Sequence, residues 1–356
     1  MKIDYLVFVP DSLTFTIASA LTALGYSVAV WVANPKLGNN ATDRALQRIA
    51  GLRGVKIERV GSMVTPTRIE RLIIQVFPRL MEQSRMVAPM VRMAEKVTLV
   101  TAGDRSHRWR KALRLQWMEL RELIKLHKVE RVVYKDGFHA FDLFRFFKPR
   151  RVVGFDIHSQ FLLDPSAFRK IHAQDWSTEA KRPISANFLG SRDPAVRERI
   201  LDSVRLCFTQ TEQTAGSGKK SMFWHEYSDS TPGGVGADEF LDILSKSDFT
   251  LCPPGYSLVT HRPLEALLRG SIPVLNADEL AIYDIGLQDG KNCIAVQPGA
   301  WPAAMSRIQK IGEEQLIGMR SEIRSMFAHT LDYPACSRSI CWRLGLKEIQ
   351  QGRISS

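Results

Sequence analysis

The chain has 356 residues, 45% of them hydrophobic and 24% charged, and this length buries about three quarters of the unfolded surface without help from disulfides or metals. The composition excludes disordered, collagenous and low-complexity proteins, and no apolar run approaches the roughly 20 residues of a membrane span. The net charge of +12 is unevenly spread, because residues 1–150 hold 26 Lys and Arg against 13 Asp and Glu, whereas residues 151–356 hold 23 against 24.

The excess positive charge of the first 150 residues favours an anionic partner, such as an acidic or phosphorylated substrate, a membrane surface or nucleic acid. A basic surface without a specific partner gives the same pattern. Nucleic acid is disfavoured, because this half has no interleaved stacking aromatics, no RNP-like signature and no helix-turn-helix pattern.

The first residues, MKIDYLVFVPDS, do not read as a signal peptide, because Asp4 and the Pro10-Asp11 pair interrupt the apolar run. The five cysteines show neither paired spacing nor a CxxC motif, so we interpret them as reduced thiols. Both observations predict a cytoplasmic protein.

Strands and helices alternate along the first half, which predicts a parallel sheet with helices on both faces. A strand at 3–9 precedes a helix at 15–24 that ends at Gly25. Residues 68–93 have a helical period interrupted by Pro78 and Pro89, so we expect two or three short helices there. Residues 108–126 form an amphipathic helix with a partly basic face. Further strands are expected at 28–32, 55–60, 129–134 and 151–155.

A second alternation begins at Ile184 and predicts a second doubly wound α/β unit. We therefore expect an N-terminal domain at 1–165, a connection at 166–183, a C-terminal domain at 184–345 and a tail at 346–356. Ligands of such units bind at the carboxyl ends of the strands. The expected elements are strands near 184–191, 222–227, 249–251, 272–275 and 293–296, with helices at 193–204, 240–246 and 262–268.

Two glycine-rich segments look like nucleotide-binding loops but lack the residue spacing that those motifs require. In residues 215–221, AGSGKKS, the position of the first required glycine is Gln213 and the position after the lysine is Lys220. The segment 233–236, GGVG, lacks the third glycine of a dinucleotide fingerprint. The eight histidines show no metal-ligand spacing, so we expect no metal site.

The informative stretch is 247–278, where a strand, a loop, a helix and a strand follow in turn. Gly255 in the loop lets a ligand approach the backbone. Thr260 is expected to cap the helix, whose N-terminus favours phosphate. Arg262 can bind a diphosphate in bidentate fashion. Glu265, one turn later, can accept both hydroxyls of a ribose, and each such charged hydrogen bond is worth about 1.5–3 kcal/mol. A surface pair between Arg262 and Glu265 is the alternative.

This stretch resembles the donor-binding signature of the exostosin-type glycosyltransferases, with a strand F-x-L-x-P-x-G, a helix start Ser/Thr-x-Arg-x-x-Glu-Ala and then Gly-x-Ile-Pro-Val. Upstream, Phe188 to Arg192 resembles the family's glycine-containing strand end. The resemblance covers residues 184–300 and is specific only in 249–274. The matching residues are Phe249, Leu251, Pro253, Gly255, Thr260, Arg262, Glu265, Ala266, Gly270, Ile272, Pro273 and Val274.

The resemblance implies a GT-B glycosyltransferase, in which two facing Rossmann-like domains bind acceptor and nucleotide sugar, and family members are generally inverting. It assigns Glu265 to the ribose, Arg262 and Arg192 to the diphosphate, and Gly255 and Tyr256 to the donor's approach. A clear DxD motif is absent, which fits metal-independent transfer in which helix dipole and arginine stabilise the leaving group. We expect a UDP-sugar donor as substrate and no cofactor. His261 can contact a phosphate or be a bystander.

Inverting transfer also needs a general base for the acceptor hydroxyl, and three loops after strands offer one. We rank Asp156 and His158 first, Asp136 and His139 second, and Asp11 third. The basic first half suits an anionic acceptor, such as a surface polysaccharide, a lipopolysaccharide core or a lipid-linked diphosphate, and peripheral contact with an acidic inner leaflet.

Three other functions stay open. A sugar-nucleotide epimerase of the same architecture would convert a donor without an acceptor. A basic nucleic-acid-binding protein would show a salt-dependent gel shift. A non-catalytic partner of a glycosyltransferase is disfavoured because Arg262 and Glu265 are present.

Overall fold

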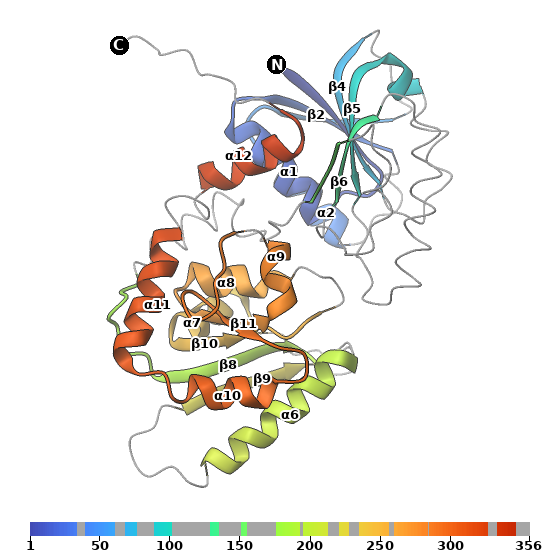
Figure 1. The fold of residues 1–356 in the computed structure, drawn as a ribbon. Helices are drawn as coiled ribbons and strands as arrows, with labels where there is room; N and C mark the ends of the chain where they lie inside the picture. Colours follow the sequence, from blue (N-terminus) through green and yellow to red (C-terminus); the bar gives the residue numbers. More distant parts are fainter. Residues whose placement is uncertain are drawn as a thin grey trace, which may run out of the picture. The chain divides into compact units, whose positions relative to one another are not determined.

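The computed structural model divides the chain into two compact units, which Figure 1 shows as ribbons. The first comprises Met1–Pro165 with Tyr333–Ser356, and the second comprises Ser166–Asp332. Among the residues that the structure describes, no helix has the length and hydropathy to cross a bilayer. The described residues are 1–33, 40–60, 68–76, 89–101, 129–134, 151–154, 176–192, 195–212, 221–227, 235–255, 260–283, 285–326 and 333–346.

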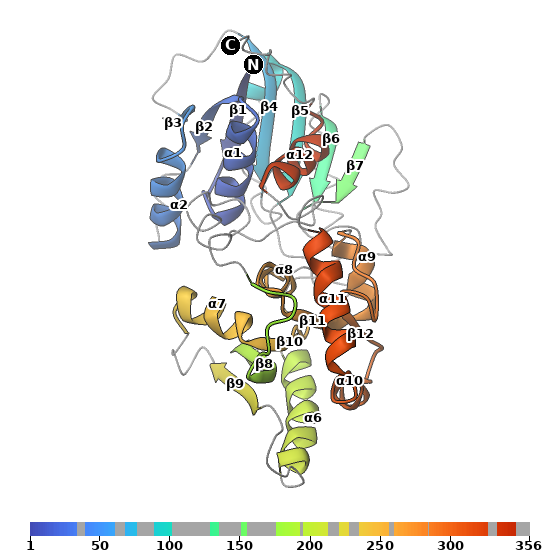
Figure 2. The same cartoon turned by 90° about the vertical axis from the view of Figure 1, so that its left-hand side faces the viewer.

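The first unit is built on a seven-stranded sheet in which every neighbouring pair is parallel. The strand order is β3-β2-β1-β4-β5-β6-β7, which can be followed from left to right in Figure 2. The order reverses direction between β1 and β4, so this is the topological switch point of the unit. The strands are β1 (Lys2–Val7), β2 (Ser27–Val32), β3 (Val55–Arg59), β4 (Ile69–Val76), β5 (Ala94–Thr101), β6 (Val129–Tyr134) and β7 (Arg151–Gly154).

The helices predicted at 68–93 are wrong in the first part of that segment, because β4 lies there, whereas residues 89–93 are helical. In β4, apolar residues stand at 69, 72, 73, 74 and 76, a spacing that fits a helix as well as a strand. A central parallel strand is buried on both faces, so it loses the alternation that would identify it. The predicted helix at 108–126 lies outside the described residues.

The first sheet is accompanied by α1 (Ser12–Ala23), α2 (Asn40–Ala50) and α12 (Tyr333–Arg343), besides the short helical stretch at residues 89–93. Helix α1 begins at a capping box in which the Asp11 side chain accepts from the Thr14 backbone and the Thr14 side chain accepts from the Asp11 backbone. Figure 2 shows α1 and α12 on the same face of the sheet, and the two helices pack against each other.

Helix α12 belongs to the first unit, whereas residues 333–345 were expected in the C-terminal domain. Its C-terminal carbonyls are bound by the sheet: Arg131 donates to the carbonyl of Arg343 at 3.2 Å, and Thr98 donates to that of Leu344 at 3.1 Å. Arg71 donates to the carbonyl of Gly345 at 3.2 Å. Cations and hydroxyls at a helix C-terminus satisfy carbonyls that the helix leaves open. These hydrogen bonds, between residues far apart in sequence, hold the end of α12 against the first sheet.

The second unit is a five-stranded parallel sheet in the order β12-β11-β10-β8-β9. Its order reverses between β8 and β10. The strands are β8 (Ile184–Ser191), β9 (Ser221–Tyr227), β10 (Ser247–Leu251), β11 (Ile272–Asn276) and β12 (Ile294–Val296). The helices are α6 (Ala195–Glu212), α7 (Ala237–Ser245), α8 (Arg262–Leu268), α9 (Leu280–Tyr283), α10 (Trp301–Ile308) and α11 (Glu313–Met326), with a 3₁₀ turn at Ala277–Glu279.

Candidate functional site

The carboxyl ends of β8 and β10 meet at the switch point of the second unit, where ligands of open α/β sheets bind. Strand β8 ends beside Gly190, and β10 runs into a buried segment at residues 252–255, which includes Gly255. Helix α8 follows that loop and supplies Arg262 and Glu265. We call Gly190, Arg197, Gly255, Arg262 and Glu265 the switch-point site.

Arg262, the first residue of α8, lies directly against the end of β8. Its guanidinium carbon is 4.9 Å from the centre of the Phe188 ring, and a Cβ atom at Gly190 would overlap the guanidinium. The side chain is half-buried and its Nε has no hydrogen-bond partner among the described residues. The Arg262 guanidinium can therefore occupy this space only because Gly190 has no side chain.

Arg197, in the first turn of α6, contacts both strand ends at the switch point. Its Nε donates to the carbonyl of Pro254 at 3.0 Å, and its Nη1 donates to that of Ser191 at 3.0 Å. A Cβ atom at Gly255 would lie only 2.6 Å from Nη2. Arg197 thereby joins the end of β8 to the loop after β10. Sequence reasoning missed this residue, because nothing in its spacing distinguishes it from the other basic residues of α6.

Glu265 lies one turn after Arg262 and is 7% exposed. Burial raises the pKa of its carboxyl to about 7, and the neighbouring Arg262 opposes this rise. None of the hydrogen bonds among the described residues uses the carboxylate. A buried acid without a hydrogen-bond donor is costly unless a ligand supplies the donor.

Arg192 lies in surroundings that differ from those expected of a diphosphate ligand. Its guanidinium binds Glu198 at 3.0 Å, Asp202 at 2.6 Å and Glu226 at 3.1 Å. These hydrogen bonds raise the pKa of Arg192 above its usual value. Three carboxylates around one cation leave a net negative charge, which disfavours a diphosphate there. The geometry therefore favours Arg262 over Arg192 as the cation that meets a donor.

Thr260 does not cap α8, in contrast to the prediction. The cap residue is His261, which makes no side-chain cap hydrogen bond, and a contact between His261 and a phosphate stays a prediction. The Thr260 backbone N–H donates to the Tyr283 hydroxyl at 2.9 Å, and that hydroxyl donates to the Thr260 carbonyl at 2.9 Å. Tyr283 is fully buried in α9. Thr260 therefore anchors the segment before α8, and its methyl group lies 3.0 Å from a Cβ position at Gly255.

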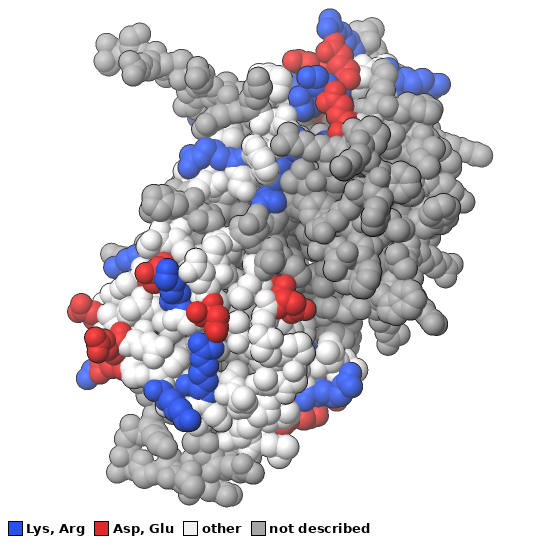
Figure 3. All heavy atoms as spheres, viewed as in Figure 1, with Lys and Arg blue, Asp and Glu red and all other residues white. Residues whose placement is uncertain are grey.

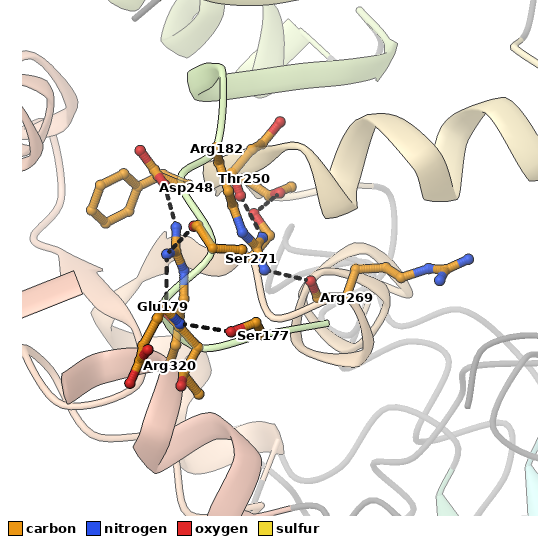
Figure 4. A network of polar contacts seen from close by, with 12 residues as sticks. Ser177, Glu179, Arg182, Asp248, Thr250, Arg269, Ser271 and Arg320 are labelled. Atoms are coloured by element: carbon orange, nitrogen blue, oxygen red, sulfur yellow. Dashed lines mark hydrogen bonds and ion pairs between the residues drawn. The ribbon is translucent and has the colours of Figure 1, made fainter. Parts of the chain in front are cut away.

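A buried cluster of charges, drawn in Figure 4, holds the other end of α8. Arg182 donates through Nη2 to the carbonyl of Arg269 at 3.0 Å and through Nη1 to that of Ser247 at 2.7 Å. Asp248, 2% exposed, pairs with the equally buried Arg320. Burial, together with the nearby Arg320, lowers the pKa of Arg182 to about 9. The cluster fixes the C-terminal end of α8 and hence the helix that carries the site.

Five predicted site residues lie outside the described residues: Tyr256, Asp136, His139, Asp156 and His158. Asp11, the third-ranked base, is described and half-buried at the carboxyl end of β1. Within the described part of the chain, no three His, Cys, Asp or Glu side chains gather as they would around a metal ion.

Comparison with known proteins gives one family match and several similar structures. Residues 166–285 match the family model of the RXYLT1 C-terminal domain. None of the curated proteins matches the chain in sequence.

Three of the similar structures cover 96–97% of this chain at low identity. A mutant of S. aureus TarM, in complex with Fondaparinux, alpha-GlcNAc-glycerol and UDP, has a TM-score of 0.61 at 8% identity, covering 96% of this chain and 99% of that one. Sucrose-phosphate synthase from Thermosynechococcus elongatus has a TM-score of 0.57 at 10% identity, with 96% and 98% covered. Anabaena HepE in complex with UDP-glucose has a TM-score of 0.54 at 13% identity, with 97% and 99% covered.

Proposed function

We propose that this chain is a glycosyltransferase that transfers a sugar from a UDP-sugar to an anionic glycan or lipid-linked acceptor, with inversion and without a metal ion. Two findings support this: residues 166–285 match the RXYLT1 C-terminal domain, and the similar structures show a GT-B fold of two parallel-sheet α/β domains. The observation that carries the proposal is the Arg262 guanidinium against Gly190, with the buried Glu265 one turn away.

The spacing of these two side chains suits a nucleoside diphosphate. Residues three apart on a helix are neighbours on one face, with about 5–6 Å between their Cβ atoms. Arg262 offers charged donors to the diphosphate, and Glu265 offers two acceptor oxygens to the hydroxyls of the ribose. The bound ribose would supply the hydrogen bonds that the Glu265 carboxylate lacks within the described residues. Uridine as the base is supported by the similar structures of TarM with UDP and of HepE with UDP-glucose.

The leaving group of the reaction is the nucleoside diphosphate, on which negative charge develops as the sugar departs. In this proposal Arg262 stabilises that charge, and preorganised charges of this kind supply much of an enzyme's rate enhancement. A fixed guanidinium can perform the task that a divalent cation performs elsewhere. This supports metal-independent transfer.

The charge of the two units supports an anionic acceptor on the first. That unit holds 31 Lys and Arg against 16 Asp and Glu, whereas the second holds 18 against 21. On the face drawn in Figure 3, acidic and basic side chains are interspersed over the described part of the second unit. We extend the proposal to peripheral contact with an acidic membrane surface in the cytoplasm. Charge reversal at Arg110 and Arg114, which lie outside the described residues, would weaken both interactions, and unchanged activity and vesicle binding would dismiss them.

A thermal-shift panel of UDP, GDP, ADP and UDP-sugars tests the donor assignment. We expect UDP to raise the melting temperature of the wild type and not that of Glu265→Gln or Arg262→Met. Glu314→Gln, an exposed change in α11, is the matched control. Stabilisation by no nucleotide would refute the donor site. A sugar-nucleotide isomer as product, formed without acceptor, would favour an epimerase, and loss of activity in EDTA would contradict metal independence.

A further inference from the structure

We propose that Asp11 is the catalytic base that takes the proton from the acceptor hydroxyl. The inference rests on the proposed function and concerns the first unit, whose switch point lies between β1 and β4. Asp11 follows β1 in the chain, and ligands of such sheets bind beyond the carboxyl ends of the strands at the switch point.

One oxygen of the Asp11 carboxylate is held by its neighbours. Oδ1 accepts from the Thr14 backbone N–H at 2.9 Å and from Nε2 of Gln75 at 3.0 Å, and the Thr14 hydroxyl lies 3.1 Å away. Among the described residues, no hydrogen bond uses Oδ2. The carboxylate is therefore fixed in orientation while its second oxygen stays available to a substrate, which is the arrangement that a general base needs.

Buried polar side chains of the first unit form the hydrogen-bond network around Asp11. Gln75 belongs to β4 and is fully buried, as are Tyr5 of β1 and Thr14 of α1. The Tyr5 hydroxyl donates to Oε1 of Gln75, and the Thr14 hydroxyl lies 3.2 Å from the same oxygen. Gln75 thus accepts with its carbonyl from Tyr5 and donates with its amide to Asp11.

Capping of α1 alone does not account for this network. A capping box needs only Asp11 and Thr14, and an apolar pair at 5 and 75 would fill the same central strands without burying polar groups. The buried Gln75 is the residue that orients the carboxylate. A polar network in the sheet core is the expected cost of holding a catalytic side chain in one position.

The reaction balances with these groups alone. Oδ2 of Asp11 accepts the proton of the acceptor O–H, the acceptor oxygen forms a bond to the anomeric carbon of the sugar, and the bond from that carbon to the diphosphate oxygen breaks. The electron pair of the broken bond leaves on the nucleoside diphosphate. Solvent then takes the proton from Asp11. Attack from the face opposite to the leaving group inverts the anomeric centre.

The variant Asp11→Asn tests the assignment, because asparagine keeps the N-cap and an oxygen for Thr14 and Gln75 while it cannot accept the proton. The probe is UDP release with water as acceptor, from whichever of UDP-glucose, UDP-galactose, UDP-glucuronic acid and UDP-N-acetylglucosamine stabilises the wild type most. We expect kcat to fall about 100-fold or more, with UDP affinity within about twofold and an unchanged urea midpoint. Asp43→Asn, an exposed change in the first turn of α2, should leave kcat within about twofold.

Should Asp11→Asn fail to fold, Asp11→Ser keeps a capping oxygen and removes the base, and the same loss of kcat is expected. UDP release by either variant within about threefold of the wild type, while Glu265→Gln loses UDP binding, would overturn the role of Asp11 and leave the donor site standing. Absence of nucleotide binding by the wild type would overturn both.

Discussion

Replacing Glu265 by glutamine removes an ionisable group from a buried position and keeps its shape. The pKa of the carboxyl rises from an ordinary value near 4.5 to about 7 on folding, chiefly because burial penalises the charged form. Above pH 7 the folded protein must hold the ionised acid, which costs about 3 kcal/mol. Glutamine carries no charge, so Glu265→Gln should be about 3 kcal/mol more stable than the wild type at pH 8.

The difference in unfolding free energy between Glu265→Gln and the wild type should depend on pH. Below pH 4.5 the acid is protonated in both the folded and the unfolded chain, and the two proteins should differ little from this cause. Between pH 4.5 and 7 the unfolded chain ionises first, so the advantage of the variant should grow by about 1.4 kcal/mol per pH unit. Above pH 7 the difference should stay constant. Urea denaturation at half-unit steps from about pH 4 to 8.5 measures it.

Ligand binding should show the opposite effect of the same substitution. Only the ionised carboxylate accepts both ribose hydroxyls, so UDP affinity of the wild type should rise through pH 7, and Glu265→Gln should bind weakly at every pH. Calorimetry on the variant at the same pH values corrects for ionisation of UDP itself. A stability difference that does not change with pH, or equal UDP affinity in both proteins, would refute the reasoning.

Three further substitutions test the surroundings of the site. Gly190→Ala places a methyl group onto the Arg262 guanidinium and should weaken UDP binding about tenfold or more by calorimetry. The control Gly318→Ala, an exposed change inside α11 with open space around it, should leave UDP binding unchanged. Equal UDP binding by the two variants would contradict the contact between Gly190 and Arg262. Asp248→Asn leaves Arg320 and Arg182 as buried cations without their carboxylate and should cost about 3–5 kcal/mol in urea denaturation, and a loss below about 1 kcal/mol would disprove that the cluster is needed. Arg192→Met should leave UDP affinity within about twofold, and a roughly tenfold loss would restore Arg192 to the donor site.

The site around α8 could be predicted because its determinants are local in sequence. Arg262 and Glu265 stand on one helix, the loop glycine precedes it by a few residues, and the helix bounds at 262–268 agree with the structure. The contacts of Arg197 and Arg192 were not predictable in this way. Both are arginines near the end of β8, and only the folded positions of Pro254 and Glu226 decide which one joins the loop and which one is surrounded by carboxylates.

The first unit was predicted less well, because a central strand that is buried on both faces shows no alternation of apolar and polar residues. The residues of β4 lie at the centre of a parallel sheet, so their apolar run carries no period of two. Helix α12 returns to this unit through hydrogen bonds from Arg71, Thr98 and Arg131, which are more than 200 residues away in sequence. No local pattern can contain such pairings.

The same long-range pairing explains why Asp11 ranked third among the bases. In sequence, Asp11 is one of several candidate bases in loops after strands, and nothing local distinguishes it from the others. Residue 75 lies 64 positions later, in a segment whose spacing suggests a helix, where a glutamine would face solvent. Once β4 pairs with β1, Gln75 comes beside Asp11 and turns a capping carboxylate into one with a fixed and an available oxygen. The catalytic meaning of Asp11 therefore depends on strand pairing, whereas that of Glu265 depends on a single helical turn.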